Sequence, residues 1–174
     1  MNARILGAVA LAVLLPVLAH AQDLTYVASF GTSAPASLQF PAGVAVSPVS
    51  GEVSVTNRLA SRVVVFDRAG NYLRSWGSPG TGPGQFYSPA GIAVGPDGSV
   101  YVGDGDNDSP SLAFLPRIQV FTPAGTFVRQ WDSYGSGDGQ FGVPIHVAVD
   151  ASGPVYPPDG GHRVQSFLSV GTWL

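Results

Sequence analysis

A repeat of about 50 residues constrains the fold of this sequence more than any other feature. A Gln-Phe pair recurs with its phenylalanine at Phe40, Phe86 and Phe141, which are 46 and 55 residues apart. After each pair, an arginine opens a five-residue segment that ends in phenylalanine, at Arg62, Arg117 and Arg163. Periods of this length are typical of arrays in which one unit stacks on its copies. The sequence therefore predicts three copies of one structural unit.

Each copy contains four short segments that predict strands rather than helices. In the second copy these segments span residues 91–94, 100–102, 117–121 and 127–131. They are rich in β-branched and aromatic residues, and turn sequences such as Gly95-Pro96-Asp97-Gly98 separate them. Strands joined by such tight turns pair antiparallel. We therefore expect an all-β fold of four-stranded antiparallel meanders, one in each copy.

The first 21 residues have the pattern of a secretory signal peptide. Arg4 supplies a positive charge, residues 5–18 are mostly apolar, and Ala19-His20-Ala21 fits the small-x-small cleavage pattern. The apolar run is shorter than the ~20 residues that a membrane-spanning helix needs, and no later run is long and apolar enough. The sequence predicts a secreted or periplasmic protein without a transmembrane segment.

The charge balance argues against a nucleic-acid partner. All eight basic residues are arginine, eleven residues are acidic, and the formal net charge is −3 at pH 7. Binding to a phosphate backbone needs a basic face, which this balance does not supply. Four arginines are dispersed among acids, so we expect them at solvated edges: Arg58, Arg68, Arg74 and Arg129. The chain has no cysteine, which excludes disulfides and thiolate metal sites.

The second copy carries a distinctive set of residues at fixed spacing, namely Gly84-Gln85-Phe86, Pro89 to Val94, Val100-Tyr101-Val102, Asp104 and Arg117 to Phe121. This set resembles an NHL repeat, the blade of a β-propeller that usually has six blades. The resemblance implies a propeller segment at residues 22–174. Its blades would span about 38–77, 84–132 and 139–174, and residues 24–31 would form an additional outer strand.

Three blades are half of the usual six, so the resemblance implies a partial or open ring. Either the reading frame is truncated, or two chains complete one ring as a homodimer. The third copy departs most from the repeat, because His146 replaces a glycine and Pro157-Pro158 interrupts its second strand. Proline removes a donor from the hydrogen-bond ladder, so we expect the third blade to be the weakest.

The loop after the second strand of the second copy is a candidate calcium site. Asp104, Asp106 and Asp108 place carboxylates at alternate positions, and oxygen-rich loops suit a hard cation. We expect no cofactor, and calcium bound in this loop is the one alternative. The resemblance to NHL repeats implies another role, in which the aspartate and asparagine of this turn brace the hairpin and the following arginine adds a charged partner.

His146 lies where the innermost strand of the third blade is expected to begin, near the central channel. Peptidyl-hydroxyglycine amidating lyases are similar to this chain in blade pattern and bind metal there through histidines. In their motif histidine directly follows proline, whereas here Ile145 separates Pro144 from His146. A one-residue offset turns a strand side chain to the other face, and a zinc site needs three or more ligands. We therefore treat His146 as a candidate binding residue rather than a zinc ligand.

An insertion between Asp108 and Pro116 distinguishes the second copy. Loops on a rigid scaffold often carry binding specificity, so Leu112 and Phe114 are candidate binding residues. Alternatively, the insertion folds back on a neighbouring blade. Together these features predict a non-catalytic scaffold that binds a protein, peptide or glycan. The alternative function is that of a metal-dependent lyase or hydrolase built on the same ring.

Overall fold

The structure, a computed structural model, describes residues 27–105, 116–131, 134–140, 142, 146–159 and 163–170. Every regular element in these ranges is a β-strand, which confirms the all-β prediction. The same ranges contain no helix that is long and apolar enough to cross a membrane.

The first sheet is a four-stranded antiparallel meander in the order β1-β2-β3-β4. Its strands are β1 (Pro41–Val46), β2 (Val53–Asn57), β3 (Arg62–Phe66) and β4 (Tyr72–Trp76). Strand β3 contains the uninterrupted apolar run Val63-Val64-Val65-Phe66, and all four side chains are buried. A run without polar alternation is expected for a strand that is covered on both faces.

The second sheet repeats the first in topology and register. Its strands are β5 (Pro89–Val94), β6 (Val100–Asp104), β7 (Arg117–Phe121) and β8 (Phe127–Trp131), in the order β5-β6-β7-β8. Val55 pairs with Val64 in the first sheet, and Val102 pairs with Gln119 in the second. The irregularity at the start of β1 recurs at the start of β5. The predicted repeat is therefore confirmed for these two units.

The third unit is a fragmented version of the same meander. It contains β9 (Ala148–Val149), β10 (Val155–Tyr156), β11 (Pro158–Asp159) and β12 (Arg163–Val164). Strand β10 pairs with β9, whereas β11 pairs with β12, so the second strand is divided at Pro157. Val155 also forms a bridge with Phe167. The prediction that the proline pair interrupts this strand is confirmed.

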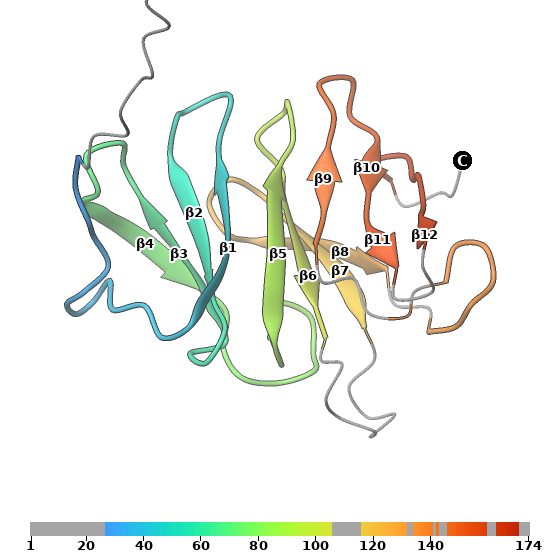
Figure 1. Ribbon diagram of the computed structural model, residues 1–174, viewed down its shortest axis with the longest axis horizontal. Coiled ribbons are helices and arrows are strands. Elements are labelled where there is room, and N and C mark those ends of the chain that lie inside the picture. The colour runs from blue at the N-terminus through green and yellow to red at the C-terminus, as the bar shows by residue number, and fades with distance from the viewer. Residues whose placement is uncertain are drawn as a thin grey trace, which may run out of the picture.

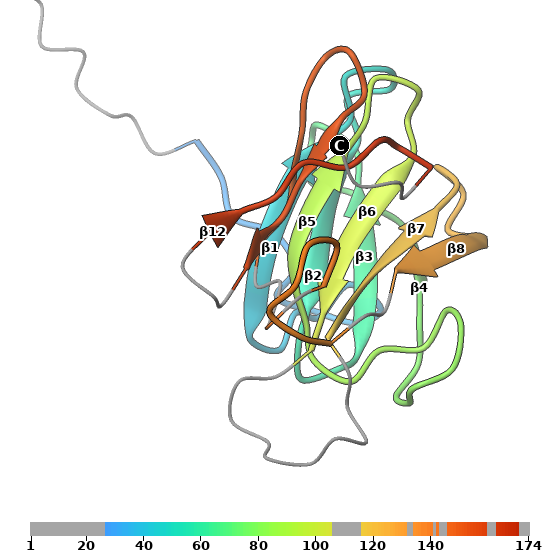
Figure 2. The same ribbon diagram turned by 90° about the vertical axis from the view of Figure 1, so that its right-hand side faces the viewer.

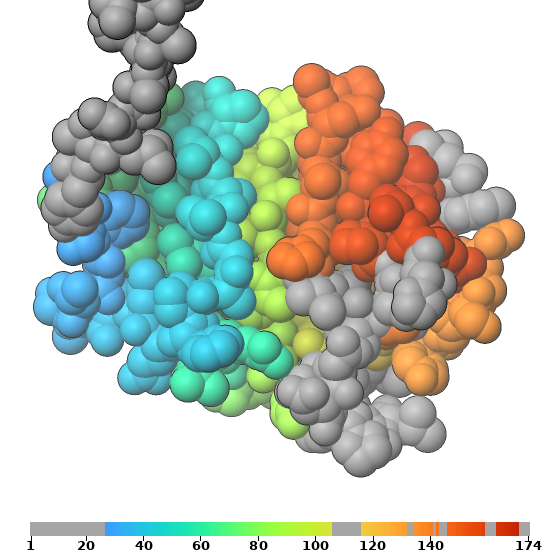
Figure 3. Space-filling model, in the orientation of Figure 1, coloured from blue at the N-terminus to red at the C-terminus, as the bar shows by residue number. Residues whose placement is uncertain are grey.

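The three units lie next to one another in chain order, as the successive colours of the surface in Figure 3 show. Figures 1 and 2 show the first strands β1, β5 and β9 side by side and the last strands β4 and β8 on the opposite side of the molecule. One apolar core lies between the first and second sheets and includes Val63, Val65, Ile92 and Phe121. Another lies between the second sheet and the third unit and includes Ile118, Val120, Val147 and Phe167. The surfaces that face each other between successive units are therefore buried.

One aromatic contact recurs at all three positions between successive segments. Trp76, the last residue of β4, packs on Phe121 of β7 with ring centroids 6.0 Å apart. Trp131 packs on Phe167 at the equivalent position, with ring centroids 5.7 Å apart, although these rings are stacked rather than tilted. Ahead of the first sheet, Phe30 packs on Phe66 at 4.8 Å. Phe30 thus lies on the first sheet as Trp76 lies on the second.

A glycine in the turn before the fourth strand makes room for this aromatic ring. A Cβ atom added to Gly125 would lie 2.6 Å from Cδ2 of Trp76, and one added to Gly70 would lie 2.8 Å from Cδ1 of Phe30. Both distances are shorter than any real carbon contact. The backbone at these glycines also has positive φ values of 90° and 84°, which glycine adopts at little cost.

We call the face of a unit that is turned toward the preceding unit its leading face, and the opposite face its trailing face. Ile92 and Val94 lie on the leading face of β5 and pack against the first sheet. The equivalent residues on β1, Val44 and Val46, are 66% and 58% exposed. Ala45 lies between them and packs into the core behind the sheet. The leading face of β1 therefore has no neighbouring sheet within the described residues.

Residues 27–38 cover only the outer part of this leading face. Leu38 and Ala36 pack with Val55, Val64 and Phe66 on β2 and β3. Leu38 lies against Gly31, where an added Cβ would be 2.6 Å from Leu38 Cδ1, just as Phe86 lies against Gly77.

The expectation that Phe40 and Phe86 are equivalent is therefore wrong. Phe86 is fully buried, whereas Phe40 is 63% exposed and has a φ of 56°. Leu38 occupies the buried position instead, since it lies beside Gly31 as Phe86 lies beside Gly77. Phe141 lies outside the described residues.

Candidate functional site: a groove between the first two sheets

Asp104 and Arg117 form a buried ion pair at the start of the second sheet. Nη2 and Nε of Arg117 lie 3.0 and 3.1 Å from Oδ2 of Asp104. The other carboxylate oxygen accepts hydrogen bonds from the backbone N–H groups of Tyr87 and Ser88, at 3.0 and 2.9 Å. Burial raises the pKa of Asp104, although the hydrogen bond from Ser88 and the charge of Arg117 act in the opposite direction. The pair ties β6 and β7 to the segment that enters β5.

The link between the sheets is held by a glutamine two residues after this arginine. Gln119 donates to the backbone oxygen of Gln85 at 2.7 Å and accepts from the backbone N–H of Gly84 at 2.9 Å. In the third unit Gln165 makes the matching bonds to Gln140 and Gly139, at 2.6 and 2.8 Å. These contacts fix the course of each link.

The first unit lacks the carboxylate of this arrangement. Asn57 replaces the aspartate and accepts a hydrogen bond from the backbone N–H of Gln39 at 2.7 Å. Arg62, the counterpart of Arg117, donates to the backbone oxygens of Pro35 and Ser37. Its Nε is buried and has no hydrogen-bond partner among the described residues. The asparagine therefore leaves one guanidinium donor of Arg62 unsatisfied.

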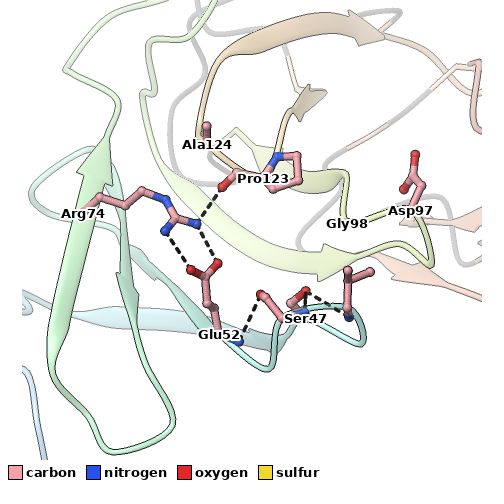
Figure 4. A pocket seen from close by; sticks show the side chains of 9 residues that line it. Ser47, Glu52, Arg74, Asp97, Gly98, Pro123 and Ala124 are labelled. Carbon is pink, nitrogen blue, oxygen red and sulfur yellow. Dashed lines mark hydrogen bonds and ion pairs between the residues drawn. The ribbon is translucent and has the colours of Figure 1, made fainter.

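A groove of about 410 Å³ opens where turns of the first two sheets meet. The first sheet contributes the β1–β2 turn, from Ser47 to Glu52, and Arg74 on β4. The second sheet contributes Asp97 and Gly98 from the β5–β6 turn and Pro123 and Ala124 from the β7–β8 turn. Figure 4 shows these groups around the groove.

An ion pair between Arg74 and Glu52 forms one wall of the groove. Nη1 and Nη2 of Arg74 donate to the two oxygens of Glu52 at 2.9 and 2.7 Å, which is a bidentate arrangement. Nη2 also donates to the backbone oxygen of Pro123 at 2.7 Å, so one side chain bridges the two sheets. The hydrogen bonds from Arg74 hold the pKa of Glu52 below its ordinary value, and the same bonds raise the pKa of Arg74.

Short-range hydrogen bonds shape the turns that line the groove. Ser47 Oγ accepts from the backbone N–H groups of Val49 and Ser50 at 3.3 and 3.2 Å. Asp97 accepts from the backbone N–H and the hydroxyl of Ser99 at 2.9 and 2.8 Å. Burial raises the pKa of Asp97, but the hydrogen bonds from Ser99 outweigh it, so the pKa lies below its ordinary value. The groove therefore presents an ionised carboxylate beside apolar turn residues.

The predicted site residues do not line this groove where the structure describes them. Asp104 is buried in the ion pair with Arg117, and both of its oxygens accept hydrogen bonds. The other predicted calcium and loop residues lie outside the described residues: Asp106, Asp108, Leu112 and Phe114. His146 is exposed just before β9. Within the described ranges, no group of three or more His, Cys, Asp or Glu residues could hold a metal ion.

The sequence did not point to the groove. Arg74 was expected at a solvated edge, but it bridges Glu52 and Pro123 across the gap between two sheets. The two ion-pair partners are separated by 22 residues and lie on different strands and turns. The sequence nevertheless contains a difference between the copies that marks this pair. Arg74 and Arg129 occupy the same place in their repeats, but only the first copy has an acidic residue at the position of Glu52.

A family model described as a 6-bladed beta-propeller (DUF5128) matches residues 44–107 of this chain. That range contains most of the first sheet and the first two strands of the second. The sheets are β-propeller blades. Because the described blades follow one another without returning to the first, they form an open array.

Two curated relatives share part of this array. Peptidylglycine alpha-amidating monooxygenase of Rattus norvegicus is 40% identical over 76 residues, and the Mus musculus enzyme is 38% identical over the same length. The matched segment is 41% of this chain and 7% of each relative. The chain therefore corresponds to a small part of the curated relatives.

Solved structures give a similar picture of the fold. A chain in the crystal structure of a nidogen/laminin complex matches 77% of this chain with a TM-score of 0.60 and 23% identity, over 46% of its own length. A chain of Kuenenia stuttgartiensis hydrazine synthase also matches 77%, with a TM-score of 0.55 and 19% identity, over 36% of its length. At these identities the likeness concerns the fold alone.

Proposed function

We propose that this chain is a secreted or periplasmic, NHL-type β-propeller segment that acts as a non-catalytic binding scaffold for a protein, peptide or glycan. The groove between the first two blades is the observation that carries the proposal. Its volume of about 410 Å³ lies within the range of roughly 300–1,000 Å³ that ligand pockets occupy.

The groove has the chemistry of a peptide site. Val49, Pro123 and Ala124 offer apolar surface, and the Asp97 carboxylate can accept hydrogen bonds from backbone N–H groups or a cationic side chain. The hydroxyls of Ser47 and Ser50 accept backbone hydrogen bonds and keep their own protons for donation. These groups can contact the apolar side chains and the polar backbone groups of an extended peptide.

The groove is also preformed. Arg74 holds the β1–β2 turn of one blade to the β7–β8 turn of the next, so the walls do not have to be ordered when a ligand binds. Preorganisation of this kind reduces the entropy cost of association. Turns that a rigid array holds in place are common sites of binding specificity.

Selection from a peptide library displayed on phage, with a glycan array in parallel, tests the proposal. Ala124→Trp would fill the groove from an exposed turn position. Ala69→Trp is the matched control, because Ala69 occupies the equivalent exposed turn of the first blade and does not line the groove. We expect selected ligands to lose at least about tenfold in affinity with Ala124→Trp and to bind the control normally.

Two results would contradict the proposal. One is the recovery of no peptide or glycan with a Kd below about 1 mM, which corresponds to roughly −4 kcal/mol. The other is a set of ligands whose affinity Ala124→Trp leaves unchanged. N-terminal sequencing of the exported protein tests localisation separately, and we expect a new N-terminus near residue 22.

The second candidate function is a metal-dependent lyase or hydrolase. The observation that favours it is the 40% identity over 76 residues to a peptidylglycine alpha-amidating monooxygenase. The name of that relative describes an enzyme that amidates peptidylglycine. Elemental analysis of the purified chain and an activity screen with and without a chelator distinguish the two functions. Stoichiometric zinc or calcium together with chelator-sensitive turnover would favour the enzyme over the scaffold.

A further inference from the structure

We propose that two copies of this chain associate head to tail, with the trailing face of the third blade of each copy on the leading face of the first blade of the other, and close one ring. The juxtaposition that carries this inference is a pair of apolar faces, at the two ends of the described array, that no other described sheet covers. Each face carries apolar residues at the positions that form the internal blade contacts.

The first unpaired face lies on β1. Val44 and Val46 are 66% and 58% exposed, although their counterparts Ile92 and Val94 lie in the core between the first two blades. Residues 27–38 cover β2 and β3 on this face and leave β1 open. Two exposed valines on alternate positions of a strand form a flat apolar surface.

The second face that no other described sheet covers lies on the third blade. Val63 and Ile118, which begin the trailing faces of the first two blades, are fully buried. Val164 holds the same position in the third blade and is 66% exposed. Ala148 is also exposed, whereas its counterparts Ala45 and Ala93 pack into the cores between blades.

The two faces are complementary because the chain already contains their contact twice. Inside the chain, the apolar trailing face of one blade packs on the first strand of the next blade. A second copy can present Ala148 and Val164 to Val44 and Val46 in the same arrangement. The occupant that we infer is therefore a second copy, and the contact continues an interface that the chain repeats internally.

The free faces at both ends of the described array have to be covered, and this requirement determines the symmetry of the pair. A head-to-tail contact leaves the opposite faces of the two chains free, and it forms a ring only if the rotation closes. Two copies of the three described blades give six, the number in the description of the matching family. A closed pair also removes exposed sheet faces that would otherwise favour aggregation.

Sedimentation velocity of the full chain, expressed from residue 1 and purified, tests the inference. We expect a species with twice the mass of one chain at micromolar concentration. Val44→Glu and Val164→Glu should each give monomers, because a glutamate in either contact would bury an unpaired charge. Leu59→Glu is the matched control, since Leu59 is 72% exposed on the β2–β3 turn, which belongs to neither face and does not line the groove.

Mixing the two variants distinguishes head-to-tail association from other dimers. In a pair of one Val44→Glu chain and one Val164→Glu chain, one contact carries both glutamates and the other carries none. We therefore expect the mixture to form a heterodimer that dissociates at higher concentration than the wild-type pair, because one contact remains. In a dimer built from two leading faces, Val164→Glu would have no effect and mixing would not restore association.

Four outcomes would overturn the inference. The first is a wild-type chain that stays monomeric up to about 100 μM, a concentration at which a dimer held by roughly 5.5 kcal/mol would be seen. The others are a dimer that Val164→Glu leaves intact, the absence of a heterodimer on mixing, and open polymers in place of a closed pair. Circular dichroism must show that the variants fold. Both substituted valines are two-thirds exposed in the single chain, so we expect unchanged spectra. Val46→Glu and Ala148→Glu test the same faces if either first variant unfolds.

Discussion

Arg117 and Asp104 form an ion pair 3.0 Å long whose side chains are only 6% and 2% exposed. Asp104→Asn would remove the charge and leave the guanidinium buried without its partner. We expect a loss of about 3 kcal/mol in the free energy of unfolding, since breaking a buried pair from one side is costly. Urea unfolding at fixed protein concentration measures the loss.

Asp138→Asn is the control for this prediction. Asp138 pairs with Arg163 at 3.5 Å, and its side chain is 68% exposed. Exposed pairs contribute little, so we expect a change below about 0.5 kcal/mol. Equal effects of the two substitutions would contradict the structural role of the buried pair.

The ion pair in the groove predicts a pH dependence. Hydrogen bonds from Arg74 and its charge lower the pKa of Glu52 from its ordinary value of 4.5. A lowered folded-state pKa gives stability that is complete above the ordinary pKa and is lost as the pH falls through the lowered value. We therefore expect Glu52→Gln to cost about 0.5 kcal/mol near neutral pH and nothing at strongly acidic pH.

A double-mutant cycle of Glu52→Gln with Arg74→Gln, measured by thermal unfolding across this pH range, isolates the pair. The coupling energy should disappear as Glu52 is protonated and should weaken as salt is added. A coupling energy that is independent of pH would show that packing, rather than charge, joins these side chains.

Trp76 tests the aromatic contact between the first two blades. Its indole N–H is buried and has no hydrogen-bond partner among the described residues. Trp76→Phe keeps most of the ring contact with Phe121 and should cost less than about 1.5 kcal/mol, whereas Trp76→Ala should cost about 3–5 kcal/mol. Denaturant unfolding followed by circular dichroism measures both. Similar losses for the two variants would mean that the indole N–H has a partner.

Gly125 tests the close approach of that ring. Gly125→Ala would place Cβ 2.6 Å from Trp76 on a backbone with a φ of 90°. Gly153→Ala is the matched control, because its φ is 107° but nothing lies within 4 Å of the added carbon. The control should lose about 1–2 kcal/mol from backbone strain, and Gly125→Ala about 1–3 kcal/mol more from overpacking. Equal losses would show that Trp76 moves aside freely.

Much of the fold could be predicted from the sequence because each blade uses the same local rules. The segment from Arg117 to Phe121 was predicted as a strand, and β7 has these limits. Turn residues at fixed spacing also predicted the order of the strands. Strand periodicity and tight turns are local properties, so single-sequence analysis recovers them.

The first link and the groove could not be predicted in the same way. Counting from Gln-Phe aligned Phe40 with Phe86, but the choice between Leu38 and Phe40 depends on which side chain fits beside Gly31. Arg74 meets Glu52 and Pro123 only after two blades have packed. Contacts between distant segments depend on that packing, which repeat spacing does not contain.

The ring of Trp76 on the glycine of the following blade has an evolutionary consequence. Each of the first two blades brings both halves of this joint, an aromatic ring at its end and a glycine in its last turn. Duplication of about fifty codons therefore adds a blade together with the means of attaching it. A lineage built on such joints can lengthen or shorten by whole blades while the interior of each blade stays as it was.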